Sequence, residues 1–472
     1  MKVLVVFTVL LISLPAFAAN HAIRLDCSNN GNGANWNCAS SPGGSGAYNT
    51  IPTSGTLVRG DTYYFSKGTL TLSYYQLADR NDGTKYITFK KATDSDYGGL
   101  SGWSSSLGND QTIFVSSASD SNYNSIWRIT DTNCGYYKWD GVYGSGPTLT
   151  DYGFLFRFGN RTPTNDNAHV YKSPANPTNI EFYHVAFEGI PNYTDMSQMA
   201  IFNGFGANCK FQYCLFDWLS NAIHGFSVDL TVDNCWFTNV WGGGINSEHG
   251  QQISYNGDRL TVSNCVFIDT LKTGGMTAFI SFNDARNPGF GADGWKIYNN
   301  TFYGCSAGAG RIVTNSSSGH TAITNLKFYN NKIVDGGGRI DTSWDNDHVG
   351  SYQAYNNLYY NASIYFEVLD PANQVHDYNY WDSTCTNKPT AEVHGKTETV
   401  SKTDLFVDPN NNNYHIKKSN SVAIENGAIL GSPYNIDKDG ISRPTGSPWD
   451  IGAYQYVSPG TPVAPRGLRI IQ

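Results

Sequence analysis

The chain has 472 residues, enough for a large hydrophobic core, yet only 15% of them are charged and the formal net charge is −8. This balance argues against nucleic acid as a partner and gives no general steering toward a polyanion. Gly (49 residues) and Tyr (31 residues) are abundant. A Gly- and Tyr-rich chain of low charge is typical of an extracellular β-solenoid with many turns.

Residues 1–18 predict a secretory signal. Lys2 precedes the apolar run 3–14, and the small-residue site at 16–18 (Ala-Phe-Ala) places cleavage before Ala19. No other stretch approaches the roughly 20 apolar residues of a membrane-spanning helix. We therefore expect a mature protein that is monomeric, has no transmembrane segment, and is secreted or held at the cell surface.

The next segments predict the start of a β-structure. Residues 19–55 are rich in loops and are expected to cap the N-terminal end of the fold. Residues 57–91 contain short strands broken by Gly and Asp turns, and we expect them to form the first coils.

An eight-residue phrase then recurs eight times, and it predicts the architecture. Its copies start 21 to 35 residues apart, and apolar residues favour the first, third and eighth positions. This strand alternation, at such a period and without a helical pattern, predicts the coils of a parallel β-helix. The copies are 180–187 (IEFYHVAF), 209–216 (CKFQYCLF), 230–237 (LTVDNCWF), 260–267 (LTVSNCVF), 295–302 (WKIYNNTF), 326–333 (LKFYNNKI), 352–359 (YQAYNNLY) and 374–381 (QVHDYNYW).

Two positions of the phrase predict buried columns. If the coils stack in register, equivalent residues lie about 4.8 Å apart. Stacked Asn amides can hydrogen-bond along such a column, and Cys can fill the same slot as a small hydrophobe. We therefore interpret these residues as structural. They are Asn234, Asn264, Asn299, Asn330 and Asn356 in the fifth position, with Val185, Cys214, Cys235, Cys265, Asn300, Asn331 and Asn357 in the sixth.

The nine cysteines are an odd number for an exported protein. Cys27 and Cys38 bracket a Gly- and Asn-rich loop that a disulfide could close. The cysteines of the sixth position are expected to stay reduced. The spacing leaves open the pairing of the remaining four, which are Cys134, Cys209, Cys305 and Cys385.

These patterns predict an all-β chain built as one solenoid. The β-helix is expected over 56–385, followed by a C-terminal capping segment (386–457) and a Pro-rich tail (458–472). A solenoid needs capped ends, because an open terminal coil would pair with another molecule.

Two runs of sequence carry a family resemblance. LVRGDTYYFSKGTLTL (57–72) resembles the first coil of the pectate-lyase-like right-handed parallel β-helix superfamily. DLFVDPNNNNYHI, with SNSVAIENGA and DIGAYQY after it, is similar to the terminal segment of choice-of-anchor exported bacterial β-helix proteins. The resemblance covers most of 56–457. It implies a right-handed solenoid and a carbohydrate-related role, because polysaccharide lyases, hydrolases and epimerases dominate the superfamily.

No named enzyme subfamily matches, and one fold hosts many chemistries. The polygalacturonase pattern (NTD, a DD pair, GHG and RIK) is absent from the chain. The calcium-pectate-lyase cluster of Asp residues with a downstream RxPxxR is absent as well.

Outward side chains of neighbouring coils predict where a site would lie. Aligning Ile223 with Ile245 places His224 beside Asn246, with Glu248 and then His249 one step further along. Continuing along this face gives a stripe of candidate residues. They are His224, Glu248, His249, Lys272, Asp284, Arg286, Arg311, Arg339 and Asp341, with Asn246, Trp218, Trp241, Tyr255 and Trp344 as candidates for contacting sugar.

Such a stripe suits β-elimination of a uronate in an extracellular polysaccharide. Arg286 or Arg311 would neutralise the carboxylate, and Lys272 or His249 would remove the C5 proton. Hydrolysis by an acid and base pair, Glu248 and Asp284, is the first alternative. The second is a non-catalytic surface or carbohydrate-binding protein, in which these side chains are solvated turn residues and His224 is half-buried.

No cofactor is required by the sequence, although two Asp- and Asn-rich turns offer oxygen ligands for Ca²⁺. They are residues 345–347 (Asp-Asn-Asp) and 408–412. Turns of this composition without metal are commoner.

Overall fold

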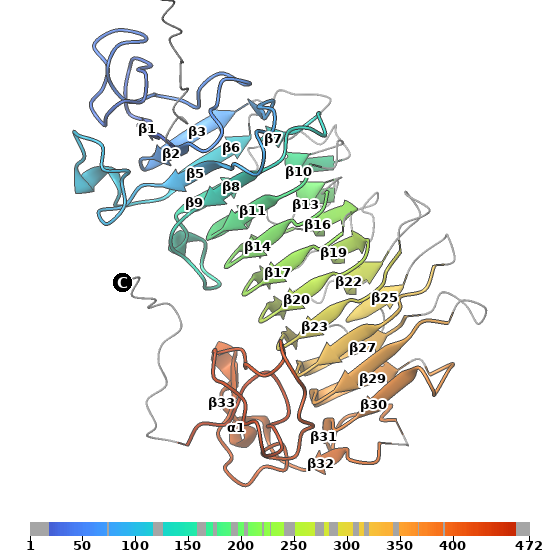
Figure 1. Ribbon diagram of the computed structural model, residues 1–472. Helices are drawn as coiled ribbons and strands as arrows, with labels where there is room; N and C mark the ends of the chain where they lie inside the picture. Colours follow the sequence, from blue (N-terminus) through green and yellow to red (C-terminus); the bar gives the residue numbers. More distant parts are fainter. Residues whose placement is uncertain are drawn as a thin grey trace, which may run out of the picture.

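The computed structural model shows a stack of coils that runs from the N-terminal to the C-terminal end of the chain (Figure 1). It describes residues 18–72, 75–116, 126–157, 167–172, 177–189, 197–202, 206–219, 221–226, 228–239, 251–269, 278–282, 291–304, 311–315, 321–342, 349–366, 368–389 and 392–458. Nearly all of its regular structure is β, and no helix among these residues could cross a membrane.

The coils form three parallel ladders. Sheet 1 is a separate sheet of 12 strands, which are β1 (Asn20–Ile23), β2 (Thr62–Phe65), β5 (Ile87–Lys91), β8 (Tyr137–Asp140), β11 (Ile180–Tyr183), β14 (Lys210–Gln212), β17 (Thr231–Asp233), β20 (Thr261–Ser263), β23 (Lys296–Tyr298), β26 (Leu326–Tyr329), β28 (Tyr352–Tyr355) and β30 (Gln374–Asp377). Its first strand, β1, comes from the segment that was expected to cap the fold.

The other two ladders belong to one sheet of 20 strands. Ladder 2 holds β3 (Gly68–Leu72), β6 (Thr112–Ser116), β9 (Phe154–Arg157), β12 (Val185–Glu188), β15 (Leu215–Asp217), β18 (Trp236–Thr238), β21 (Val266–Ile268), β24 (Thr301–Tyr303), β27 (Lys332–Ile340), β29 (Leu358–Phe366), β31 (Tyr380–Asp382) and β32 (Lys396–Glu398). Ladder 3 holds β4 (Tyr75–Gln76), β7 (Trp127–Arg128), β10 (Asn167–Lys172), β13 (Ser197–Phe202), β16 (Asn221–Phe226), β19 (Gln251–Asn256), β22 (Ala278–Phe282) and β25 (Val313–Asn315). The two ladders merge at the long strands β27 and β29, because β27 pairs with both β24 and β25.

This arrangement is the right-handed parallel β-helix that the repeat and the family resemblance predicted. The first five residues of each phrase cover a sheet 1 strand, and the last two lie on ladder 2. The eighth position stacks aromatic rings inside the helix, with centroids 4.7 Å apart for Phe216 and Phe237 and 4.4 Å apart for Phe237 and Phe267. The core is therefore a set of columns that follow the register of the strands.

The backbone conformation explains why Asn recurs at the fifth position of the phrase, which strand alternation alone did not predict. Asn234, Asn264, Asn299, Asn330 and Asn356 all have φ between 53° and 58°. Asn tolerates this left-handed conformation better than most residues. A single left-handed residue thus turns the chain from sheet 1 into ladder 2.

The sixth position carries buried side chains that bridge successive coils. Asn331 Nδ2 donates to Asn357 Oδ1 at 3.1 Å, and Asn357 Nδ2 donates to Asn379 Oδ1 at 3.0 Å. Each of these oxygens also accepts the backbone N–H of the preceding Asn. At the end of the series, Asn379 Nδ2 donates to Glu392 Oε1 at 2.7 Å. The amide groups are thereby satisfied in the interior, where an unpaired one would be costly.

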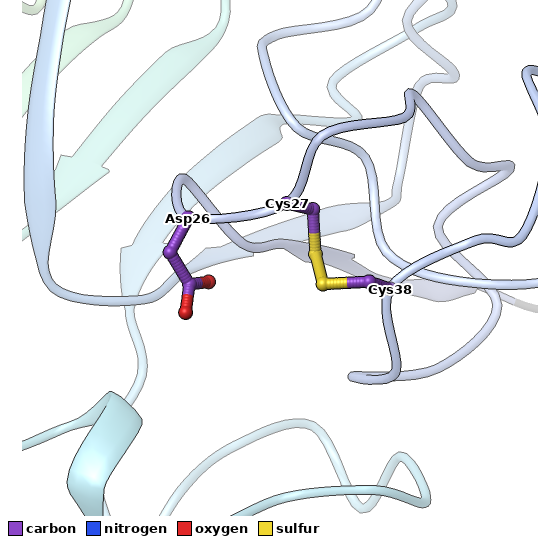
Figure 2. Close-up of side chains that lie close together, drawn as sticks. All are labelled: Asp26, Cys27 and Cys38. Carbon is purple, nitrogen blue, oxygen red and sulfur yellow. A yellow bond between two sulfur atoms is a disulfide. The ribbon is translucent and has the colours of Figure 1, made fainter.

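Cysteines occupy the same slot in earlier coils. Cys235 Sγ accepts the backbone N–H of Cys214, and Cys265 Sγ accepts that of Cys235. All three thiols are free and buried, as the sequence predicted. Cys27 and Cys38 form the predicted disulfide (Figure 2). Cys134, Cys209 and Cys385 are free and buried, whereas Cys305 lies outside the described residues.

The C-terminal segment, residues 402–456, lies along the side of the last coils (Figure 1). It contains α1 (Lys402–Leu405), β33 (Phe406–Asp408) and β34 (Asn413–Ile416). Three short 3₁₀ helices, Ser105–Leu107, Leu149–Asp151 and Pro409–Asn411, complete the regular structure. Leu405, Phe406 and Ile416 pack against outward side chains of ladder 2 such as Leu358 and Tyr380.

Lys332 is buried beneath this segment. Its Nζ donates to the backbone oxygen of Tyr414 and lies 4.8 Å from the ring centroid of Tyr454. Burial, with a smaller contribution from the nearby Arg443 cation, lowers the pKa of Lys332 to about 7. The charged form of this side chain is therefore disfavoured in the folded protein.

We expect the N331A variant to lose about 2–4 kcal/mol of unfolding free energy, because it leaves the amide and backbone groups of two neighbouring coils without partners. Urea unfolding followed by circular dichroism checks this value. The N373A variant is the control, because Asn373 is exposed, and its effect should stay within about 0.5 kcal/mol. Equal effects of the two variants would contradict a structural role of the buried amides.

We also expect stability to rise with pH through Lys332. Its pKa in the folded protein lies below that of the unfolded chain, so the unfolded state binds more protons between about pH 7 and pH 10.5. Unfolding free energies at pH 7 and pH 9 should differ by about 2 kcal/mol more in the wild type than in the K332M variant. The same pH dependence in both proteins would show that Lys332 is not the titrating group.

Candidate functional site

The register of ladder 3 places one outward side chain per coil in a row. Ile223 pairs with Ile253, Ile253 with Ile280, and Ile280 with Val313. These alkyl side chains belong to the core, so the residue after each of them points to the outer face. The resulting row is His224, Ser254, Ser281, Thr314 and Asp341, and we name it the polar column. It spans about 19 Å at roughly 4.8 Å per coil.

This register corrects the alignment that was predicted from the sequence. Ile223 pairs with Ile253 and not with Ile245, so His224 lies beside Ser254 and not beside Asn246. The alternation in β19 is regular, but the segment before it is longer than the corresponding segment one coil earlier. Alternation alone gives no register when such an insertion intervenes.

The polar column is almost closed to solvent. Its five side chains are each at most 7% exposed. His224 is thus more deeply buried than in the non-catalytic interpretation of the sequence, which expected it to be half-buried. It does not line an open groove. The partially exposed groups of this region lie at its edge instead.

Two arginines and one tyrosine form that edge. Arg311 NH1 donates to Thr314 Oγ1 at 2.9 Å, and no carboxylate of the described residues pairs with this half-buried guanidinium. Arg339 lies 3.7 Å from a carboxylate oxygen of Asp341 and 4.9 Å above the ring of Tyr365. The Tyr365 side chain is 49% exposed. These groups offer donors for a carboxylate and a flat apolar face for a sugar ring.

Tyr365 lies between two copies of the phrase (352–359 and 374–381), so no repeat marks its position, and the sequence prediction missed it. The register of β29 against β27 sets it directly beside Arg339. The alternation of exposed and buried residues in β29 is the only local signal that the Tyr365 side chain points outward.

The structure overturns one of the predicted sugar platforms. Tyr255 is fully buried, its ring packs near Trp295, and its hydroxyl donates to the backbone oxygen of Asp258 at 3.1 Å. It is therefore a core residue. The Trp218 side chain is half-buried, so part of its ring stays accessible and it remains a candidate.

The remaining candidates lie outside the described residues. They are Glu248, His249, Lys272, Asp284, Arg286, Asn246, Trp241 and Trp344, together with the turn at 345–347.

The described residues contain one group of three potential metal ligands, Asp26, Cys27 and Cys38 (Figure 2). It does not fit a metal ion, because the two sulfurs are bonded to each other and Asp26 pairs with Arg24 at 2.7 Å. At the other suggested calcium turn, Asp408 Oδ2 accepts a hydrogen bond from Asn411 Nδ2 at 2.7 Å.

Comparison with known proteins supports the fold. No family model matches the chain, and no curated protein is similar to it in sequence. Among solved structures, the crystal structure of pectate lyase Pel9A aligns over 94% of this chain and 97% of its own, with a TM-score of 0.54 and 12% identity. A rhamnogalacturonan lyase aligns over 83% and 91% (TM-score 0.42, 11% identity), and the PL6 family alginate lyase AlyGC over 73% and 51% (TM-score 0.36, 10% identity). At such low identity, the first alignment establishes the β-helix fold alone.

We expect the Y255F variant to unfold about 1 kcal/mol more easily than the wild type, because it loses a buried hydrogen bond. The matched control is Y365F, which removes the same hydroxyl from an exposed ring and should change stability by less than about 0.5 kcal/mol. Urea unfolding of the two variants checks the difference. A Y255F protein as stable as the wild type would argue against this hydrogen bond.

Proposed function

We propose that this protein is exported and acts on a uronate-containing polysaccharide by β-elimination. The observation that carries the proposal is the state of Arg311. Its guanidinium is half-buried, and within the described residues its one hydrogen-bond partner is the Thr314 hydroxyl and no carboxylate neutralises it. A cation held this way on the outer edge of a coil suits the carboxylate of a uronate.

The chemistry needs one cation and one base. Arg311, with Arg286 as the second predicted cation, neutralises the carboxylate and so acidifies the C5 proton. His249 or Lys272 takes this proton, the C4–C5 double bond forms, and the C4–O bond breaks as the leaving oxygen gains a proton. The exposed ring of Tyr365, with Arg339 above it, supports a neighbouring sugar unit.

Two features support export. The N-terminal run 1–18 has the pattern of a secretory signal. The Cys27–Cys38 disulfide suits an oxidising compartment, where such bonds persist.

A second candidate function is polysaccharide binding without catalysis at a cell surface. The burial of the polar column favours it, because His224 and its neighbours offer no open cleft for a reacting sugar. Glu248 and Asp284, the acid and base of the hydrolytic alternative, lie outside the described residues, as do His249 and Lys272.

The test is a screen of the purified chain from Ala19 against acidic and neutral polysaccharides. Ultraviolet absorbance of unsaturated products and the release of reducing ends are followed together. We expect both signals on a uronate polymer, and a loss of about 100-fold in kcat/KM in the R311A variant. The R259A variant is the control, because Arg259 is an exposed arginine that pairs with Asp229, and its activity should match the wild type.

Other outcomes would redirect the proposal. Reducing ends without absorbance would replace elimination by hydrolysis. Absence of both signals, with polymer binding that the Y365A variant loses, would establish the second candidate.

A further inference from the structure

A pocket of about 300 Å³ lies between the outer face of sheet 1 and the C-terminal segment. Its floor comes from β14, β17, β20 and β23, and residues 433–437 supply the facing wall. The floor of this pocket belongs to sheet 1, whereas Arg311 and the polar column lie along ladder 3. Its volume is at the lower end of the range for ligand sites, which suits one sugar unit or a short saccharide.

Asp233 organises the floor. Its Oδ1 accepts hydrogen bonds from Ser263 Oγ and Asn264 Nδ2, both at 2.7 Å. Its Oδ2 accepts from Asn234 Nδ2 at 2.7 Å and from Gln212 Nε2 at 3.0 Å. Four neutral donors thus occupy the acceptor sites of the carboxylate, and no described cation pairs with it.

This arrangement excludes two classes of ligand. A metal ion would have to displace the donors that already occupy the lone pairs of Asp233. The lining holds two carboxylates, Asp233 and Asp437, and no lysine or arginine. Four cations lie around it: Lys438 and Arg443 donate to Asn264 O and Asn299 Oδ1, and Lys210 and Lys296 pair in register with Thr231 and Thr261. An acidic sugar inside the pocket would still bring its carboxylate close to two others, which disfavours it. The pocket therefore suits an uncharged ligand.

Several polar groups of the lining remain available to such a ligand. The hydroxyls of Thr231 and Thr261, which pair in register on neighbouring strands, make no hydrogen bond within the described residues. The side-chain oxygen of Gln212, Oε1, accepts no hydrogen bond within the described residues, whereas its Nε2 donates to Asp233. The half-buried Tyr298 adds an aromatic ring to the same floor. Hydroxyl and amide groups beside an aromatic ring are the contacts that a neutral sugar takes.

The facing wall is held in place by the left-handed asparagines. Asn299 Nδ2 donates to the backbone oxygen of Ile436 at 2.8 Å, and Asn330 Nδ2 donates to that of Tyr434 at 3.4 Å. The rings of Tyr298 and Tyr434 meet edge to face at 5.0 Å. The pocket is therefore formed before a ligand arrives, which lowers the cost of binding.

We propose that this pocket binds a neutral sugar unit and gives the protein a second carbohydrate contact, separate from the edge of ladder 3. The proposal does not depend on catalysis, because it rests on groups of sheet 1 and the C-terminal segment.

Calorimetric titration of the full chain with cellotetraose, mannotetraose, galactotetraose and tetragalacturonate tests it. We expect at least one neutral tetrasaccharide to bind, and the T231V/T261V variant to bind it roughly 10-fold more weakly, because two hydroxyl contacts are lost. The T88V variant is the matched control, since Thr88 is an outward residue of the distant strand β5. It should bind as the wild type does.

A second variant distinguishes a loss of binding from a loss of folding. I436W enlarges a side chain that is 45% exposed at the wall, and it should block binding while leaving the unfolding transition unchanged. R311A should keep neutral binding, so a failure of the lyase proposal stays distinguishable from a failure here. The inference is overturned if no neutral tetrasaccharide binds, if T231V/T261V and I436W bind it as tightly as the wild type, or if tetragalacturonate binds at this pocket.

Discussion

A left-handed residue followed by a buried bridging side chain joins sheet 1 to ladder 2 in coil after coil, and the register of the β-helix depends on this pair. Eight successive turns, from His184 to Tyr378, have φ between 53° and 58°. A turn of a single residue has no extra length that could absorb a shift of the strand register. A slip by one position would reverse every side chain between core and solvent, so the turn and the aromatic stack support the same register.

The sixth position of the phrase accommodates both Cys and Asn, because each side chain supplies a hydrogen-bond acceptor. The sulfur of Cys265 and the amide oxygen of Asn331 both accept a backbone N–H from the preceding coil. Asn also brings two donors that must be satisfied, and its neighbours do so: Asn331 Nδ2 reaches Asn357 and the backbone oxygen of Ile297. Cys brings one weak donor, and the thiol of Cys235 reaches the backbone oxygen of Phe211 at 3.6 Å.

The same turn shapes the outer surface. Asn356 exchanges two hydrogen bonds with the backbone of Ala428, and Asn299 holds Ile436, so the amides that permit the turn also hold the C-terminal segment against the helix. One side of the molecule thereby gains a polar pocket whose lining holds two carboxylates and no lysine or arginine. The edge of ladder 3 instead presents Arg311 and Arg339, and this difference in charge is why we propose different sugars for the two regions.

The sequence alone determined the β-helix, the stacking of the repeat and the buried cysteines, because alternation and the recurring phrase are local and each copy repeats the same contacts. The phrase does not extend to ladder 3, where insertions of different length separate the strands. The register of His224 and the burial of Tyr255 were therefore decided only by the folded chain. The pocket joins Asp233 to a wall that begins at Pro433, 200 residues later in the sequence (433 − 233). Long-range packing decides which outward faces are covered, and no local pattern records it.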